Sequence, residues 1–156
     1  MSVAPGEAEG ALRQIDDVLA KYAREESLAL VCEVLRSTFA HYRWVGVYLL
    51  HGDVLDLAGW DGPAATEHTQ IPIARGVCGQ AAREGRTVIV EDVRSAPEYL
   101  ACFLETRSEI VVPIRDGRTI LGEIDIDGNE VAAFDASDRA FLEQVADRLS
   151  ASWVAD

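Results

Sequence analysis

The chain carries three cysteines, and each occupies a different kind of predicted position. Cys32 falls on the apolar stripe of a predicted helix, where a free cysteine packs as a small hydrophobic side chain. Cys78 follows Gly76 at the predicted start of a short helix, where backbone N–H groups and the helix dipole favour a thiolate. Burial at a tight turn is the alternative for Cys78. Cys102 lies in a long connection, where a redox or nucleophilic role competes with simple packing.

An acidic strand is the second feature with chemical potential. In the segment 123–127 the side chains alternate, so Glu123, Asp125 and Asp127 share one face. Aligned carboxylates repel one another, and strands are depleted in Asp, which argues against an ordinary solvated strand face. If this face lines a pocket, the acids share protons and can hold an ammonium group, donate a proton or bind a divalent cation. Glu109 begins the preceding predicted strand and can join them.

Composition and charge restrict the class of protein. The 156 residues are 49% apolar and 26% charged, as in ordinary globular domains, and 14 basic against 27 acidic residues give a net charge of −13. A surface this acidic repels phosphates, so we expect neither nucleic acid nor anionic membranes as partners. No apolar run approaches the roughly 20 residues of a membrane span. Because the sequence shows no secretory signal either, we expect a cytoplasmic protein. An odd, small number of cysteines does not suit a secreted disulfide framework.

The hydrophobic periodicity predicts one α+β domain over residues 1–156, with an ordered core of about 11–153. Hairpins dominate the pattern, so the central sheet should be mostly antiparallel. Helices at both ends should cover one face of the sheet, and loops should cover a ligand pocket on the other. The predicted helices cover about residues 11–22, 27–42 with Ser27 as N-cap, 77–84, and a last helix capped by Asp135. The predicted strands cover residues 44–50, 54–58, 69–73, 87–90, 109–114 and 119–127.

Familiar cofactor and metal motifs are missing from the sequence. There is no HExxH, no CxxC and no phosphate loop, because the segment 76–79 lacks the required lysine. We therefore expect no cofactor and no metal centre. His41 and His51 fall in connecting segments and are expected on the surface.

Five segments, taken together and in order, carry a family resemblance. They include Trp-Val-Gly-Val-Tyr-Leu, an Arg-Gly-Val-Cys-Gly turn, Leu-Ala-Cys and Gly-Glu-Ile-Asp-Ile-Asp. The set resembles the free methionine-(R)-sulfoxide reductases, which are stand-alone GAF domains, and the resemblance runs from about residue 43 to 150. The segments are residues 44–49, 71–79, 100–102, 108–113 and 122–127.

The resemblance implies a redox cycle carried by two of the cysteines. Cys102 matches the nucleophile that attacks the sulfoxide sulfur, and Cys78 matches a second cysteine able to form a disulfide with it. A thioredoxin-like donor would then reduce the disulfide. The implied reaction is thiol-dependent reduction of free L-methionine-(R)-sulfoxide.

The resemblance also implies a substrate pocket. Glu109, Asp125 and Asp127 match acidic residues that bind free methionine sulfoxide and assist protonation of its oxygen. Trp44 and Tyr48 match aromatic residues near the methyl end of the substrate. This agrees with the chemistry of the residues themselves, because a thiolate that reduces a sulfoxide needs an acid beside it.

Three positions depart from the family pattern. His68 stands where the family usually has a third, resolving cysteine, Phe103 stands where it has Asp, and Glu123 stands where it has an apolar residue. Resolution would therefore depend on Cys78 or on an external thiol. All three are predicted as walls of the pocket, with a base or a metal ligand as the other readings of His68.

Three functions are open at this point. The first is the reductase. The second is a small-molecule-binding module that senses an amino acid or similar cation without chemistry. The third is a redox or metal switch that uses Cys78 and Cys102, or the acids with His68. GAF domains often pair through their helices, so a homodimer is expected.

Overall fold

The computed structural model describes residues 2–96 and 103–155, so Cys102 lies outside the described residues. The helices are α1 (Pro5–Lys21), α2 (Arg24–Thr38), α3 (Gly76–Glu84) and α4 (Ala136–Ala155), with a short 3-10 turn at Val93–Ser95. The strands are β1 (Trp44–His51), β2 (Val54–Asp61), β3 (Gln70–Pro72), β4 (Val88–Val90), β5 (Ser108–Asp116) and β6 (Thr119–Gly128).

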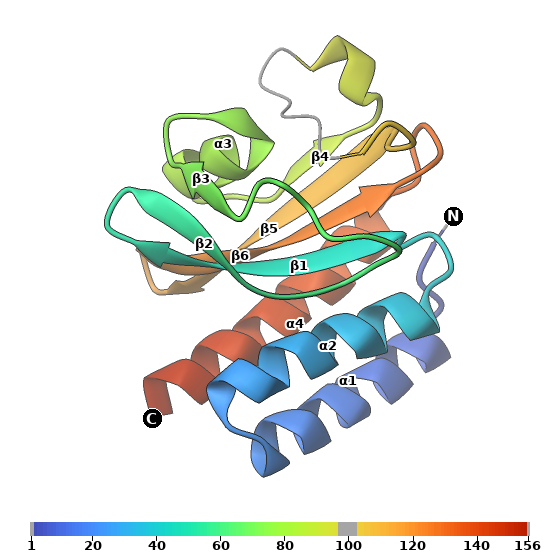
Figure 1. Ribbon diagram of the computed structural model, residues 1–156. Coiled ribbons are helices and arrows are strands. Elements are labelled where there is room, and N and C mark those ends of the chain that lie inside the picture. The colour runs from blue at the N-terminus through green and yellow to red at the C-terminus, as the bar shows by residue number, and fades with distance from the viewer. Residues whose placement is uncertain (1, 97–102, 156) are drawn as a thin grey trace.

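A six-stranded sheet forms the middle layer, in the order β3-β2-β1-β6-β5-β4, and every neighbouring pair is antiparallel. Figure 1 shows α1, α2 and α4 together under one face of this sheet, with α3 above the other. The predicted α+β class, antiparallel sheet and terminal helices on one face are confirmed. No helix among the described residues is long and apolar enough to cross a membrane.

The main core lies between the sheet and the three terminal helices. Ile124 and Ile126 of β6 point into it, beside Ile15 of α1, Val31 of α2 and Leu142 of α4, and all five are fully buried. Burying such side chains stabilises the fold by roughly 1.5–3 kcal/mol each. Since strand side chains alternate, this packing directs Glu123, Asp125 and Asp127 to the opposite face.

Three helix boundaries differ from the sequence pattern by more than one residue: the starts of α1 and α2, and the end of α2, which lies at Thr38 and not near residue 42. α1 begins at Pro5, earlier than the periodicity indicates, because proline is accepted in the first helical turn. α2 begins at Arg24, so Ser27 as N-cap is wrong: its hydroxyl lies inside the helix and donates to the carbonyl of Arg24 at 2.7 Å. Asp135 does cap α4, accepting from the backbone N–H of Ser137 at 2.8 Å.

His41 is buried, which corrects the expectation of a surface position. Its Nε2 lies 2.7 Å from Oδ1 of Asp138, which also accepts from the Tyr42 hydroxyl at 2.8 Å. His41 and Tyr42 thus provide hydrogen-bond partners for the buried carboxylate of Asp138 on α4. We therefore assign these three residues a structural role. His51 is exposed as expected and bonds to Asp56.

The central pairing of β1 with β6 joins segments far apart in the chain. Its register places Trp44 opposite Asp127, Gly46 opposite Asp125 and Tyr48 opposite Glu123. On the other side of β6, Glu109 of β5 lies opposite Asp127. The acids are therefore flanked by aromatic residues on one strand and by a further acid on the other.

Candidate active site

The acidic strand is buried under α3 and its neighbours. Glu123, Asp125 and Asp127 share one face of β6, as the alternation predicts, and none exposes more than 2% of its surface. Together with Glu109, which is also buried, four carboxyl groups occupy one side of the sheet. The solvated strand face is excluded, and the reading in which these acids line an interior site is the one that the fold supports.

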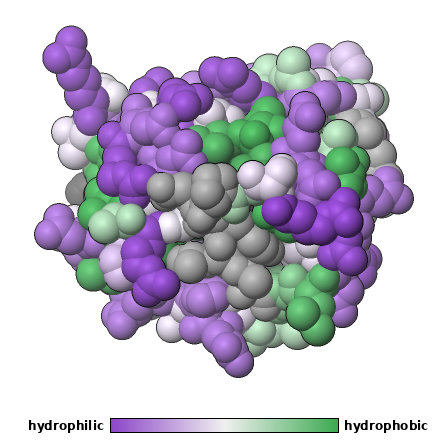
Figure 2. Space-filling model, turned by 90° about the horizontal axis from the view of Figure 1, so that it is seen from above, coloured by the Kyte–Doolittle hydropathy of each residue, from purple (hydrophilic) through white to green (hydrophobic). Residues whose placement is uncertain are grey.

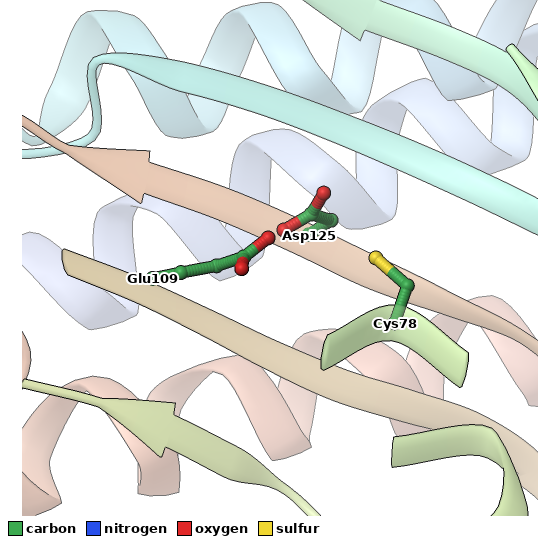
Figure 3. A group of neighbouring side chains, drawn as sticks. All are labelled: Cys78, Glu109 and Asp125. Atoms are coloured by element: carbon green, nitrogen blue, oxygen red, sulfur yellow. The ribbon is translucent and has the colours of Figure 1, made fainter. Parts of the chain in front are cut away.

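Cys78 joins this cluster from α3. Figure 3 shows its sulfur and the Glu109 carboxyl both directed toward Asp125. The Sγ of Cys78 and one carboxylate oxygen each of Glu109 and Asp125 all lie within 4.8 Å of one another. Residues from α3, β5 and β6 thus meet at one point, although the sequence separates Cys78 widely from the other two. The ring nitrogens of His68 are not among the potential ligand atoms that meet at Cys78, Glu109 and Asp125.

Several oxygens in the cluster have no hydrogen-bond partner among the residues that the structure describes. They are both carboxylate oxygens of Glu123, Oδ1 of Asp125 and Oδ1 of Asp127. No Lys, Arg or His within the described ranges forms a salt bridge with any of the three. A buried carboxylate without a partner is unfavourable. These carboxyl groups should therefore either hold a proton or pair with a cation.

Burial sets the protonation of these acids. Burial raises the pKa of Glu123 well above its ordinary value. The neighbouring Cys78 thiol opposes this rise, and the charge of Asp125 adds to it. Burial likewise raises the pKa of Asp125, against hydrogen bonds with Glu109 and Cys78. For Asp127, burial and then the charge of Asp125 raise the pKa. The cluster can therefore hold protons at a pH where exposed carboxyls have lost them.

The Cys78 thiol is held in its protonated form. Burial raises its pKa well above the ordinary value, and the negative charges of Asp125, Glu123 and Glu109 raise it further. Of the two alternatives for Cys78, the structure therefore favours burial at a tight turn over activation by the start of a helix, because three carboxyl groups surround the sulfur. Cys78 is a poor nucleophile until a proton acceptor or a cation changes this environment.

The Glu123→Gln variant should be more stable than the wild type, increasingly so as pH rises. Because the folded-state pKa of Glu123 is raised, the free energy of unfolding of the wild type falls as pH rises from about 4.3 through the raised value. Glutamine does not titrate. We expect the variant to gain more than about 1 kcal/mol near pH 8 and less near pH 5, measured by urea unfolding with EDTA present.

Glu9→Gln is the matched control, since Glu9 is exposed on α1. It should leave the free energy of unfolding unchanged at both pH values. A Glu123→Gln variant that is less stable than the wild type near pH 8 would show that the carboxylate has a stabilising partner in the folded protein.

An aromatic wall stands beside the acids. Trp44 stacks on Trp60 with ring centroids 6.4 Å apart and an interplanar angle of 12°, and it contacts Phe103 at 6.0 Å. The Trp44 ring lies over Gly46, where any side chain would collide with it. Trp44, Phe103 and Pro63 line a cavity of about 220 Å³. Figure 2, seen from above, shows this side of the molecule as mostly hydrophilic, with apolar patches between.

Tyr48 is joined by a hydrogen bond to the backbone of His68. Tyr48 is fully buried on β1, and its hydroxyl donates to the backbone carbonyl of His68 at 2.8 Å. The backbone N–H of His68 in turn bonds to Oγ1 of Thr66 at 3.0 Å. Tyr48 thereby holds the chain just before β3 in place, and the wall position of His68 stays a prediction.

Thr106 links the acids to the cavity, and the sequence analysis missed it. Its hydroxyl lies 3.4 Å from Oδ2 of Asp127, and Thr106 also lines the cavity beside Trp44. Trp60 and Gly46 were missed as well. A β-strand pattern extended past residue 58 would have indicated Trp60, whereas the roles of Gly46 and Thr106 depend on strand pairing that no local pattern specifies.

Comparison with known proteins agrees with this architecture. The family model for the GAF domain matches residues 23–153. The chain belongs to the GAF domain family. The GAF domain is 39% identical over 131 residues to the free methionine-R-sulfoxide reductase of Saccharomyces cerevisiae, covering 81% of this chain and 71% of the yeast protein.

Solved structures of similar proteins extend this likeness to three dimensions. The GAF domain superposes with a TM-score of 0.88 on the free methionine-R-sulfoxide reductase of Neisseria meningitidis in complex with its substrate, at 38% identity, covering 99% of this chain and 94% of that one. The type II free methionine-R-sulfoxide reductase of Thermoplasma acidophilum gives a TM-score of 0.80 at 37% identity, covering 87% and 94%. The resemblance read from the sequence is thus confirmed.

Proposed function

We propose that this GAF domain reduces free L-methionine-(R)-sulfoxide with a cysteine nucleophile. The observation that carries the proposal is the buried face of Glu123, Asp125 and Asp127, whose carboxyl groups have oxygens without a hydrogen-bond partner among the described residues. These acids lie beside the Cys78 thiol, and Thr106 joins them to the aromatic-lined cavity. Similar proteins named free methionine-R-sulfoxide reductases support it, one of them solved in complex with its substrate.

The acids fit the ammonium group of a free amino acid. Asp125 and Asp127 each have one buried oxygen without a described partner, so an incoming ammonium group can pair with them. Binding a cation lowers the pKa of the acids, and protons are released as the ligand enters. A peptide-bound methionine has no ammonium group beside its side chain, so the site should select the free amino acid.

The aromatic wall fits the other end of the ligand. Trp44 and Phe103 offer apolar surface to a methyl sulfoxide, and the buried Nε1 of Trp44 has no described partner and can donate to an oxygen. The Tyr48 hydroxyl fixes the backbone carbonyl of His68. The carboxyls that hold protons can deliver one to the sulfoxide oxygen as it leaves sulfur.

The chemical cycle balances with two thiols and an external donor. The Cys102 thiol gives two electrons to the sulfoxide sulfur and accepts its oxygen, so methionine and a sulfenic acid form. The Cys78 thiol then attacks the sulfenic sulfur, forming a disulfide and releasing water. A thioredoxin-like dithiol reduces the disulfide by exchange. Carboxyls beside Cys78 can accept its proton during the second step.

A non-catalytic amino-acid sensor is the second candidate. The observation that favours it is that Cys78 is buried with a raised pKa, so the thiol beside the acids is not poised for attack. Such a module would bind a free amino acid through its ammonium group and consume no thiols.

Turnover of the two sulfoxide epimers tests the proposal. Purified protein receives free L-methionine-(R)-sulfoxide or the (S) epimer with thioredoxin, thioredoxin reductase and NADPH, or with dithiothreitol. We expect NADPH oxidation and free methionine with the (R) epimer alone, and none with a peptide that contains methionine sulfoxide. No turnover with either reductant would overturn the reductase, and stoichiometric binding of the (R) epimer without thiol loss would identify the sensor.

A further inference from the structure

We propose that Cys78, Glu109 and Asp125 form a binding site for a thiophilic divalent cation such as Zn²⁺. Their ligating atoms, one sulfur and two carboxylate oxygens, lie within 4.8 Å of one another. In a tetrahedral zinc site, bonds of about 2.0–2.3 Å place neighbouring ligand atoms roughly 3.4–3.6 Å apart. Small side-chain rotations therefore bring the three atoms to bonding distance, and Figure 3 shows them already directed toward a common point.

The cluster also has the unpartnered groups that a cation site requires. Oδ1 of Asp125 and both oxygens of Glu123 are buried without a hydrogen-bond partner among the described residues. Glu123 adjoins Cys78 from the same strand face as Asp125. A bound cation would coordinate Asp125 and balance the charge of Glu123. Buried oxygens without a hydrogen-bond partner therefore indicate a ligand more strongly than a cluster of acidic residues does.

The donor set selects the class of metal. Magnesium and calcium ions take oxygen ligands and octahedral or larger shells, which a sulfur in a crowded interior does not suit. Zinc, cobalt(II) and cadmium accept mixed sulfur and oxygen ligands in four-coordinate sites. Three protein ligands leave a fourth position open, so the site resembles an exchangeable zinc site more than a closed structural one.

The location gives the cation a regulatory consequence, which rests on the proposed function. The same carboxylates would hold the substrate ammonium group, and the same thiol would resolve the sulfenic acid. Zinc would therefore compete with methionine sulfoxide and protect Cys78 from oxidation. A Cys78 disulfide would in turn release the metal, because its sulfur no longer supplies a thiolate.

Cobalt(II) titration of the full-length, reduced protein tests the site without substrate. We expect a thiolate-to-cobalt charge-transfer band that saturates at one ion per chain and is removed by added Zn²⁺. Cys78→Ser should abolish the band, and Asp125→Asn should weaken cobalt binding by at least about tenfold. Cys32→Ala is the matched control, since Cys32 is fully buried on the helix-covered face, and it should leave the band unchanged.

Two results would overturn the site. One is the absence of the band from reduced wild-type protein. The other is a band that persists in Cys78→Ser and disappears in Cys102→Ser. Because the titration uses no substrate, a protein without reductase activity can still show the band, and an active reductase without the band contradicts the metal site alone.

Discussion

Changing Cys102 to serine is expected to abolish reduction of free L-methionine-(R)-sulfoxide, lowering kcat/KM by at least about 10⁴-fold. The attacking group must be a thiolate. Burial raises the pKa of Cys32 far above its ordinary value, with Asp61 adding to the shift, and burial with Asp125 does the same for Cys78. Neither of these buried thiols is suited to attack, so the proposed nucleophile is Cys102, the position to which the family resemblance gives this role. NADPH consumption and methionine production measure the effect.

The Cys78→Ser variant separates attack from resolution. It should release about one equivalent of methionine per chain in a first turnover, because the attacking thiol is intact. Later turnovers with thioredoxin should slow, while dithiothreitol, which can reduce a sulfenic acid directly, should sustain them. Cys32→Ala should match the wild type in all three assays. A first turnover that survives in Cys102→Ser and is lost in Cys78→Ser would reverse the two roles.

Changing Asp125 to asparagine should lower kcat/KM for the sulfoxide by roughly 30- to 5000-fold, the equivalent of about 2–5 kcal/mol for losing one partner of a buried charge pair. Asn keeps the shape of the side chain and removes the charge that would meet the ligand ammonium group. Asp125 is the centre of the cluster, in contact with Cys78 and Glu109. Steady-state kinetics with dithiothreitol as reductant measure the effect.

The stability of the same variant distinguishes lost binding from lost folding. Burial raises the pKa of Asp125, so removing its ionisable group should leave the free energy of unfolding near pH 8 unchanged or higher. Asp17→Asn, on the exposed side of α1, should alter neither kinetics nor stability. An Asp125→Asn variant with wild-type kcat/KM would remove this carboxylate from the substrate site.

The local sequence predicted the elements well where one physical rule dominates. The alternation at residues 123–127 placed three acids on one face of a strand, because successive strand side chains point to opposite sides. Gly85 ends α3 directly after the predicted last residue 84, in the left-handed conformation that glycine accepts without strain. The Ser27 and His41 predictions failed because the local sequence cannot distinguish a helix cap from a serine inside a helix, or a surface histidine from a buried one. Tertiary packing decides both.

The sequence by itself determined the α+β class, the family and the acid face, since these follow from periodicity and from short motifs in order. Only the tertiary structure decided that this face is buried, that Trp44 lies beside Asp127, and that Cys78 reaches Asp125 from α3. Those relations depend on the pairing of β1 with β6 and on the packing of α3, contacts between distant segments that local patterns do not encode. The same packing made Cys78 a protonated thiol, because burial among carboxyl groups outweighs the dipole at the start of its helix.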